Sequence, residues 1–250
     1  MVRFIRPFWV SHQGFPIFSV DTHPKEDKFA TGGADGTVRI WGVGPLFKKP
    51  TPKLLSTIVV DSTTNIVRWS PNGKLLAIAG DNKIVTILKL KSTTPAFDGK
   101  TYNFETYEAV YNLRTHVDSV TDLAWSPSGD FLASASLDNT VAIWDVHKGD
   151  LVETLRGHKK CVYGVAWDPL NKLLVSHDSS CAIIWDLEHF EQREVIEEPF
   201  KESMHGNFSC RPSWSYDGSQ LVLVGTTLKK KHTAIVTSRD AEQLLHFQGH

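Results

Sequence analysis

The sequence has few cysteines and no surplus of charge of either sign. Its three cysteines, Cys161, Cys181 and Cys210, are widely spaced, and no Cys-x-x-Cys pair is present. Neither a disulfide framework nor a zinc site is therefore expected, and a reducing compartment is the default expectation. The 27 Lys and Arg residues nearly balance the 28 Asp and Glu residues, for a net charge of −1. This balance gives no support to direct binding of nucleic acid or of a membrane surface.

Long hydrophobic runs are also missing. The opening stretch "MVRFIRPFWV" is basic and partly apolar, but Pro7 interrupts it and no apolar signal-peptide core follows. No other stretch approaches the length that spans a membrane. The 250 residues are 41% hydrophobic and 22% charged, which is ordinary for a globular protein, so we expect a soluble intracellular chain.

The sequence does contain a repeated unit, marked by a tryptophan that precedes a turn. The tryptophans are separated by 56, 42 and 47 residues, and a histidine stands nine residues before three of them. The tryptophans are Trp69, Trp125, Trp167 and Trp214, and the histidines are His116, His158 and His205. A second tryptophan follows Trp125 by 19 residues and Trp167 by 18 residues.

The phrases "TGGADGTVRIWG" at 31–42 and "SASLDNTVAIWD" at 134–145 repeat one pattern of small residues, acidic turn and β-branched run. A period near 40–45 residues with Gly-His and Trp-Asp punctuation is typical of a WD40 β-propeller. The sequence therefore predicts an all-β fold, in which Asp35-Gly36 and Asp138-Asn139 supply positive φ angles for tight hairpins. The expected units are residues 11–60, 61–114, 115–156, 157–203 and 204–248, with 249–250 opening a further unit.

Four polar residues of a unit are expected to converge as one hydrogen-bonded network inside a blade. An acidic turn would orient the imidazole, and a hydroxyl and an indole N–H would complete the network. Unit two lacks the set, because Asp61 and Leu88 stand at the histidine and tryptophan positions, and unit five has no second tryptophan. The predicted networks are His116, Ser134, Asp138 and Trp144; His158, Ser176, Asp178 or Ser179, and Trp185; and His12, Thr31, Asp35 and Trp41.

Histidine, serine and aspartate together also suggest a hydrolase. A catalytic site would not be repeated in three units of one chain, however, and no Gly-x-Ser-x-Gly elbow is present. The glycine-rich "GGADG" at 32–36 lacks the Lys-Ser/Thr of a phosphate loop and precedes a strand. His158-x-x-Cys161 and His177 with Cys181 do not supply four metal ligands. We therefore expect no catalytic residue, no cofactor and no metal, and a binding platform in place of an enzyme.

Arg211 is the first candidate for contact with a partner. It stands three residues before Trp214 on what should be an innermost strand, where the other units have Ser19, Ile66, Asp122 and Gly164. A planar five-donor head near a channel mouth suits a partner carboxylate or carbonyl, and the alternative is a salt bridge between two blades. Tyr163 and Asp118 are weaker candidates on the adjoining units.

The stretch "WVSHQGFPIFSVDTHPKEDKFATGGADGTVRIW" at 9–41 resembles the opening of the HIR/HIRA family of histone chaperone subunits. The similarity continues through "VRWSPNGKLLAIAGDNKIV", "LASASLDNTVAIWD" and "TLRGHKKCVYGVAWDP". The WD40 subunit of chromatin assembly factor 1 is similar in units three and four, but its start resembles this one less.

The resemblance implies a nuclear scaffold subunit that helps to deposit histones H3–H4 independently of replication and represses transcription, histone genes included. It implies a ubinuclein/Hpc2-type partner within a multi-subunit complex, with H3–H4 contacted indirectly. The alternatives are the chromatin assembly factor 1 subunit and a generic WD40 adaptor such as a ubiquitin-ligase substrate receptor. Because the resembled propeller has seven blades and five units fit here, we expect an open ring with an unpaired edge that self-associates.

Overall fold

The computed structural model describes residues 9–44, 53–97, 99, 102–200, 211–228 and 231–248. The chain divides into two compact units, Met1–Arg114 and Thr115–His250, which are described separately below. In the described residues the regular structure is β-strand, apart from 3₁₀ conformation at Gly44 and in the short helix η2 (Glu198–Phe200). The expectation of an all-β fold is therefore confirmed. His205, Cys210, the segment 3–8 and residues 249–250 lie outside the described residues.

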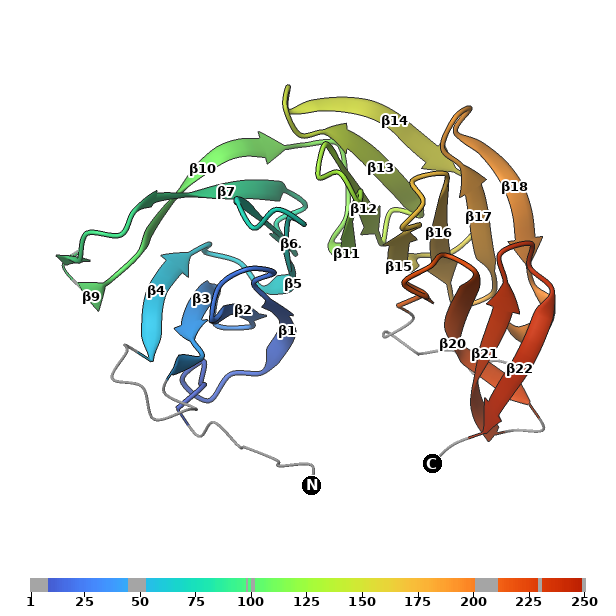
Figure 1. Ribbon diagram of the computed structural model, residues 1–250, viewed down its shortest axis with the longest axis horizontal. Helices are drawn as coiled ribbons and strands as arrows, with labels where there is room; N and C mark the ends of the chain where they lie inside the picture. Colours follow the sequence, from blue (N-terminus) through green and yellow to red (C-terminus); the bar gives the residue numbers. More distant parts are fainter. Residues whose placement is uncertain are drawn as a thin grey trace. The chain divides into compact units, whose positions relative to one another are not determined.

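The first unit contains two four-stranded antiparallel sheets, coloured from blue to green in Figure 1. Blade 1 has the order β1 (Ile17–Thr22), β2 (Lys28–Gly33), β3 (Thr37–Gly42) and β4 (Leu54–Val59). Blade 2 comprises β5 (Thr64–Trp69), β6 (Leu75–Gly80), β7 (Val85–Ser92) and the outermost strand β10 (Thr106–Leu113). Such short meandering sheets are the blades of a propeller.

A small hairpin inside blade 2 accounts for the 56-residue spacing between its inner tryptophan and the next. Strands β8 (Ala96–Phe97) and β9 (Tyr102–Asn103) are inserted between β7 and β10 and pair only with each other. Asn103 Oδ1 accepts the backbone N–H of Thr57 on β4 over 2.8 Å. The insertion therefore ties blade 2 to the outermost strand of blade 1.

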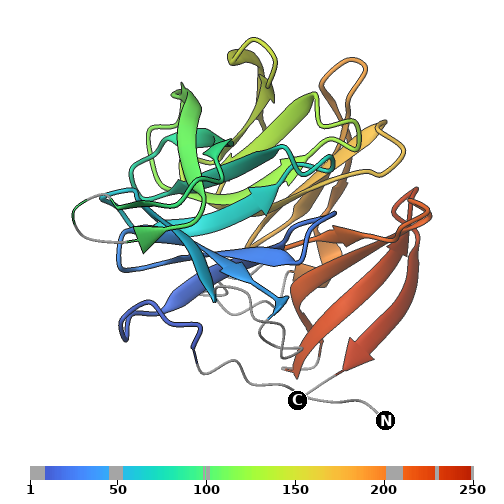
Figure 2. The same cartoon turned by 60° about the vertical axis from the view of Figure 1, so that its left-hand side comes forward.

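The second unit contains three further antiparallel sheets, each in the order in which its strands follow one another. Blade 3 has β11 (Val120–Trp125), β12 (Phe131–Ser136), β13 (Thr140–Asp145) and β14 (Asp150–Arg156). Blade 4 has β15 (Val162–Trp167), β16 (Leu173–Asp178), β17 (Ala182–Asp186) and β18 (Glu191–Ile196). Blade 5, red in Figure 2, has β19 (Ser213–Trp214), β20 (Gln220–Leu228), β21 (Lys231–Ser238) and β22 (Gln243–Gln248).

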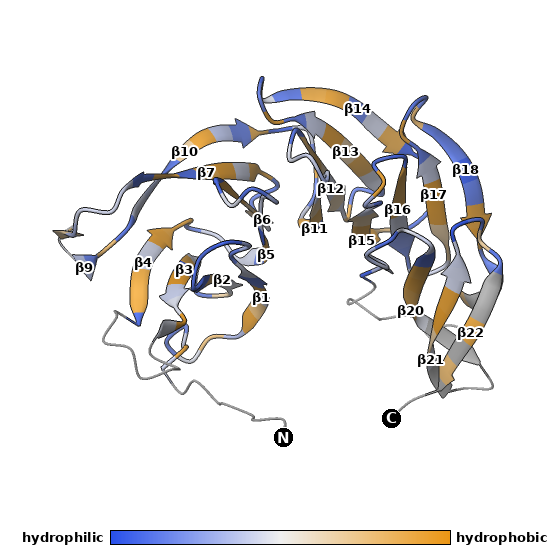
Figure 3. Ribbon diagram, in the orientation of Figure 1, coloured by the Kyte–Doolittle hydropathy of each residue, from blue (hydrophilic) through white to orange (hydrophobic). Residues whose placement is uncertain are grey.

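The core lies between neighbouring blades, where the middle strands carry small and β-branched residues. Ala133 and Ala135 of β12 are fully buried and belong to one cluster with Val162, Val165 and Leu174 of blade 4. The small side chains let the two sheets approach closely, and the β-branched ones fill the pleated surface between them. The outermost strand β18 is in contrast mostly exposed and hydrophilic (Figure 3).

Innermost strands of adjacent blades are also joined by polar side chains. Ser19 Oγ accepts the backbone N–H of Val67 over 3.1 Å in the first unit. At the matching position of blade 3, Asp122 Oδ2 accepts the N–H of Val165 over 3.1 Å. These bonds satisfy backbone donors that a sheet edge would otherwise leave without a partner.

The hairpin between the second and third strands differs in one respect from expectation. Both central residues of each hairpin were expected to have a positive φ. Only the second one does, with 70° at Gly36 and 68° at Asn139. The preceding aspartate instead accepts the N–H two residues ahead, from Thr37 to Asp35 and from Thr140 to Asp138. The acidic side chain therefore shapes the turn as an Asx motif. No helix of the described residues is long and apolar enough to cross a bilayer.

Candidate functional site

The network of blade 3 joins four segments of one sheet. His116 precedes β11, Ser134 lies on β12, Asp138 forms the next turn, and Trp144 lies on β13. His116 Nδ1 is 2.9 Å from Asp138 Oδ2, and its Nε2 is 2.8 Å from Ser134 Oγ. The indole N–H of Trp144 donates to the same Ser134 oxygen over 2.9 Å.

One tautomer satisfies this whole chain of hydrogen bonds. If His116 carries its proton on Nδ1, it donates to the Asp138 carboxylate and accepts the Ser134 hydroxyl proton at Nε2, while Trp144 donates to Ser134. Burial alone would raise the pKa of Asp138, but the hydrogen bonds from His116 and Thr140 outweigh it and hold that pKa well below its usual range. The network is therefore a fixed set of partners around an ionised carboxylate.

Blades 1 and 4 repeat the arrangement. His12 Nδ1 lies 2.7 Å from Asp35 Oδ1, and Thr31 Oγ1 lies 2.8 Å from His12 Nε2 and accepts the indole N–H of Trp41 over 2.7 Å. Arg39 adds a contact of its own, donating to Asp35 Oδ2 over 3.0 Å and to the carbonyl of Ser11 over 2.7 Å.

In blade 4 the structure selects Asp178 over Ser179 as the acidic member. Asp178 Oδ2 is 2.7 Å from His158 Nδ1, and Ser176 Oγ is 2.6 Å from His158 Nε2. The Trp185 N–H donates to Ser176 over 2.7 Å. Asp178 is fully buried, yet its pKa is held well below the usual range because His158 and Ser180 donate to it and outweigh its burial.

Each network has a further member that the sequence reasoning missed. The residue four positions before the tryptophan also faces the histidine: Thr37 in blade 1, Thr140 in blade 3 and Cys181 in blade 4. Thr140 Oγ1 donates to Asp138 over 2.6 Å. The recurrent Asp-x-Thr spacing of "DGT" and "DNT" was the available signal.

Blades 2 and 5 lack this network in the described residues. Leu88 pairs with Leu76 in the register in which Trp144 pairs with Leu132. In blade 5 the corresponding residue is Thr237, opposite Leu221. Both replacements remove the indole donor that completes the network.

The networks are built for structure. The hydroxyls of Ser134 and Ser176 are fully buried, and each oxygen already accepts an indole N–H. A nucleophile must reach its substrate with a free line of attack, which these oxygens do not have. What the networks do is tie the loop before each first strand to the hairpin of the same blade.

The buried group of His158, Asp178 and Cys181 brings three ligand-type atoms within 4.8 Å of one another. A structural zinc ion takes four protein ligands, whereas the described residues bring three together here. The Nδ1 of His158 is also already bonded to Asp178. The donor set fits a hydrogen-bonded network better than a bound ion.

Of the partner candidates, Arg211 is the one whose contacts are clearest. Its Nε lies 3.6 Å from Asp122 Oδ1 of blade 3, and its Nη2 donates to the carbonyl of Thr121 over 3.5 Å. The interblade salt bridge considered above is thus present, although the Arg211 side chain remains 37% exposed. Tyr163 lies on β15, and Asp118 is exposed in the loop before β11.

The amino-acid sequence was compared with known protein families and proteins. Residues 3–239 match the family described as the CAF1B/HIR1 beta-propeller domain. The chain is 32% identical over 269 residues to Protein HIR1 of Cryptococcus neoformans. It is 38% identical to Protein HIRA of Takifugu rubripes and 37% identical to Protein HIRA of Homo sapiens, each over 272 residues.

These alignments cover 100% of this chain but only 30% of the Cryptococcus protein and 26% of each of the two HIRA proteins. The chain thus spans less than a third of the length of the relatives it matches. The match over residues 3–239, the five blade-like sheets and the repeated networks agree with one another. The chain belongs to the CAF1B/HIR1 β-propeller family and corresponds to the propeller region of the HIR/HIRA proteins.

Proposed function

We propose that this chain is a non-enzymatic scaffold subunit of a nuclear histone chaperone complex. The observation that carries the proposal is the similarity of its whole length to HIR1 and HIRA proteins. In this role it would help to assemble H3–H4 nucleosomes independently of replication and would repress transcription, including that of histone genes. The networks support the proposal because they fix the blades and loops of a rigid binding platform.

The partner in this proposal is a ubinuclein/Hpc2-type subunit, with histones H3–H4 contacted through the complex. A near-neutral net charge of −1 supports protein partners over direct binding of DNA. Arg211 is proposed as part of the partner surface, because more than a third of its side chain stays accessible beside Asp122. The planar five-donor head of an arginine can bind more than one acceptor.

Affinity capture tests the proposal. The chain, carrying an affinity tag, is expressed in cells and recovered, and its companions are identified by mass spectrometry against the tag alone. We expect a ubinuclein/Hpc2-type subunit and other histone chaperone subunits. Recovery of cullin-adaptor proteins in their place would contradict the proposal and favour a ubiquitin-ligase receptor.

One second candidate is favoured by a specific observation, since the matched family groups HIR1 with CAF1B. A subunit of chromatin assembly factor 1 would act with replication. In the same capture experiment it would recover the other subunits of that factor and no ubinuclein/Hpc2-type protein.

A further inference from the structure

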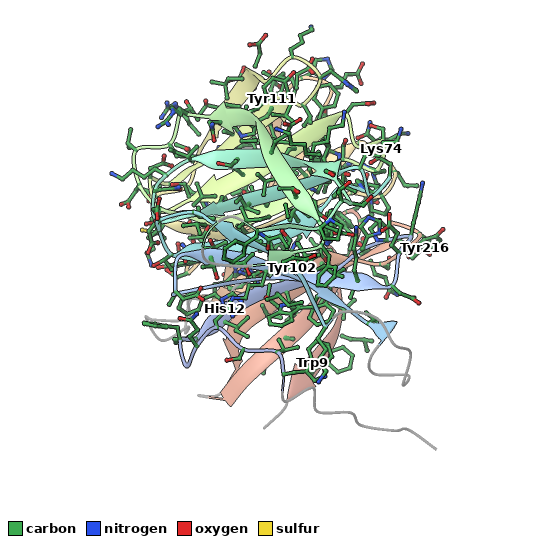
Figure 4. The ribbon with its side chains drawn as sticks, turned by 90° about the vertical axis from the view of Figure 1, so that its left-hand side faces the viewer. Trp9, His12, Lys74, Tyr102, Tyr111 and Tyr216 are labelled. Carbon is green, nitrogen blue, oxygen red and sulfur yellow. The ribbon has the colours of Figure 1, made fainter. Side chains whose placement is uncertain are left out.

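A cleft of about 270 Å³ opens in the first unit, between blades 1 and 2. It is lined by the turn after β1, the turn after β5 and the last residues of β7. Trp69, Tyr107 and Leu90 contribute its apolar wall, and Lys25, Lys74 and Lys89 its rim. In Figure 4, Lys74 lies toward the opposite end of the unit from His12, so the cleft is remote from the blade 1 network.

The corresponding position between blades 4 and 5 is filled. Arg239 follows Thr237 by two residues, and its guanidinium lies 5.7 Å from the Trp214 ring and donates to the buried Asp168 over 2.8 and 2.5 Å. It also donates to the carbonyl of Gly218 over 3.0 Å. This arginine therefore occupies the space beside the inner tryptophan.

Between blades 1 and 2 the same positions hold different residues. Leu90 follows Leu88 by two residues and so takes the place of Arg239, and His23 follows the inner strand β1 as Asp168 follows β15. The His23 Nε2–H donates to the carbonyl of Gly73 over 2.9 Å. The Lys28 Nζ lies 5.7 Å from the Trp69 ring, and a cleft of about 270 Å³ remains beside these two side chains, with Leu90 in its lining.

The walls of the cleft are held in place before any ligand arrives. The His23 ring packs edge-on against Trp69 at 4.7 Å, and its Nδ1 accepts the N–H of Glu26 over 2.9 Å. Tyr107 donates its hydroxyl to Glu105 over 2.6 Å. Because these groups are already ordered, an inserted side chain would cost little further conformational entropy.

Charge at the rim is unbalanced. Lys28, only 4% exposed, is neutralised by Glu105 at 3.1 Å and Glu26 at 2.9 Å. Lys25, Lys74 and Lys89 are exposed, and none forms an ion pair with a described residue. An apolar wall under three uncompensated amines suits a ligand that has both an apolar group and negative charge.

We propose that this cleft binds an acidic peptide segment, which inserts one apolar side chain against Trp69 and Leu90 and places its carboxylates beside Lys25, Lys74 and Lys89. A free anion could use the three rim amines but not the apolar wall, and the His23 Nε2–H and the Tyr107 hydroxyl already have acceptors. Duplex DNA presents phosphates without an apolar side chain. Arg211 does not line this cleft. The proposal for the cleft does not depend on which complex the chain joins.

The probe is a pool of fluorescein-labelled peptides with three Asp or Glu residues on each side of a central pair drawn from Leu, Ile, Met, Phe and Trp. Titrated with the full chain, it should bind with a Kd of about 10–100 μM, as for one apolar anchor with acidic flanks. Binding should weaken at least about fivefold between low and high salt, because the rim lysines are solvent-exposed. A pool with a Ser-Ser centre should bind at least about tenfold more weakly.

Two variants locate the site. Leu90→Arg introduces the residue type found in blade 5 and should abolish binding of the peptide pool. Lys74→Glu reverses one charge at the rim and should weaken binding of the pool about fivefold. Lys159→Glu, at an exposed lysine of the second unit, should bind as the unaltered chain does. Unchanged thermal unfolding of Lys74→Glu keeps the test valid if Leu90→Arg misfolds.

Several results would overturn the proposal. These are no binding of the pool, equal binding of the Ser-Ser pool, or equal loss with Lys159→Glu and Lys74→Glu. Full competition by inorganic phosphate would assign the cleft to a simple anion. Binding of a duplex oligonucleotide with the same dependence on Leu90 and Lys74 would assign it to nucleic acid.

Discussion

Cys181 occupies in blade 4 the place that Thr140 occupies in blade 3. Each stands four residues before the tryptophan of its network, and Cys181 Sγ lies 3.8 Å from His158 Nδ1 where Thr140 Oγ1 lies 3.4 Å from His116 Nδ1. Ser180 supplies the hydroxyl that the cysteine lacks, donating to Asp178 over 2.8 Å. The exchange leaves a buried thiol inside a polar network.

The buried thiol should be chemically inert in the folded chain. Burial and the neighbouring Asp178 carboxylate raise the pKa of Cys181 to about 12, so almost no thiolate forms at neutral pH. Iodoacetamide labelling read by site-resolved mass spectrometry should modify Cys181 only after denaturant is added. The half-buried Cys161 is the internal comparison, and native labelling of Cys181 at the rate of Cys161 would refute this protection.

Loss of a network histidine should destabilise the fold. His116→Ala removes one buried hydrogen-bond partner from each of Asp138 and Ser134, and we expect a cost of about 1–3 kcal/mol in the free energy of unfolding. The exposed His147, whose side chain is 73% accessible, provides the control. Urea unfolding should show little change for His147→Ala. Equal stability of the two variants would argue against the network as a stabilising element.

The Asp138 carboxylate should make stability depend on pH in acid. Its pKa is lower in the folded state than in the unfolded chain, so the unfolded chain binds more protons between the two values. The stabilisation is therefore complete above about pH 4, the ordinary aspartate range, and is lost as the pH falls toward the folded value. Asp138→Asn keeps an acceptor for His116 but cannot titrate.

Urea unfolding at a series of pH values from neutral to acid measures this effect. Asp138→Asn should be less stable than the unaltered chain at neutral pH, and the difference should shrink as the pH falls below about 4. A constant difference at every pH would show that the Asp138 charge does not contribute.

The buried ion pair between blades 4 and 5 should matter far more than an exposed one. Arg239→Ala leaves the fully buried Asp168 without its cation, which we expect to cost about 3 kcal/mol. Arg193 forms a pair with Asp240 at 2.6 Å, but both side chains are largely exposed, and Arg193→Ala should cost less than about 1 kcal/mol. Thermal and urea unfolding distinguish them, and similar losses for both would contradict the burial argument.

Local sequence pattern predicts the blades well because each network is written within one repeat. The spacing of His116, Ser134, Asp138 and Trp144 follows from strand length and hairpin geometry, so their convergence could be anticipated. The choice of Asp178 over Ser179 could not, because the blade 4 hairpin has one more residue between its aspartate and its tryptophan than the blade 3 hairpin has.

Of the features that join different blades, the sequence reasoning offered only a salt bridge at Arg211, without naming its acceptor. The β8–β9 insertion and the contact of Arg211 with Asp122 depend on how neighbouring sheets pack. To predict the cleft beside Trp69, one must know that Leu90 stands where blade 5 has Arg239. Only the register of the strands gives that correspondence. Repeat patterns describe one blade at a time, whereas binding surfaces form between blades.

Arg211 offers a test of the proposed partner surface. Arg211→Ala and Arg211→Lys should each weaken binding of a labelled ubinuclein/Hpc2-type segment, since neither keeps the planar five-donor head. Arg211→Lys keeps a cation beside the buried Asp122, so circular dichroism should show an intact fold for this variant. Equal affinities, or loss of binding only together with unfolding, would confine Arg211 to a structural role.

The central claim, that the chain is the scaffold of a histone chaperone complex, is tested most directly by mixing it with a purified ubinuclein/Hpc2-type subunit. Size-exclusion chromatography with light scattering measures the mass of the product, and H3–H4 alone serves as the comparison. We predict a stable complex with the subunit and none with H3–H4 alone. Separate elution of the chain and the subunit would contradict the account.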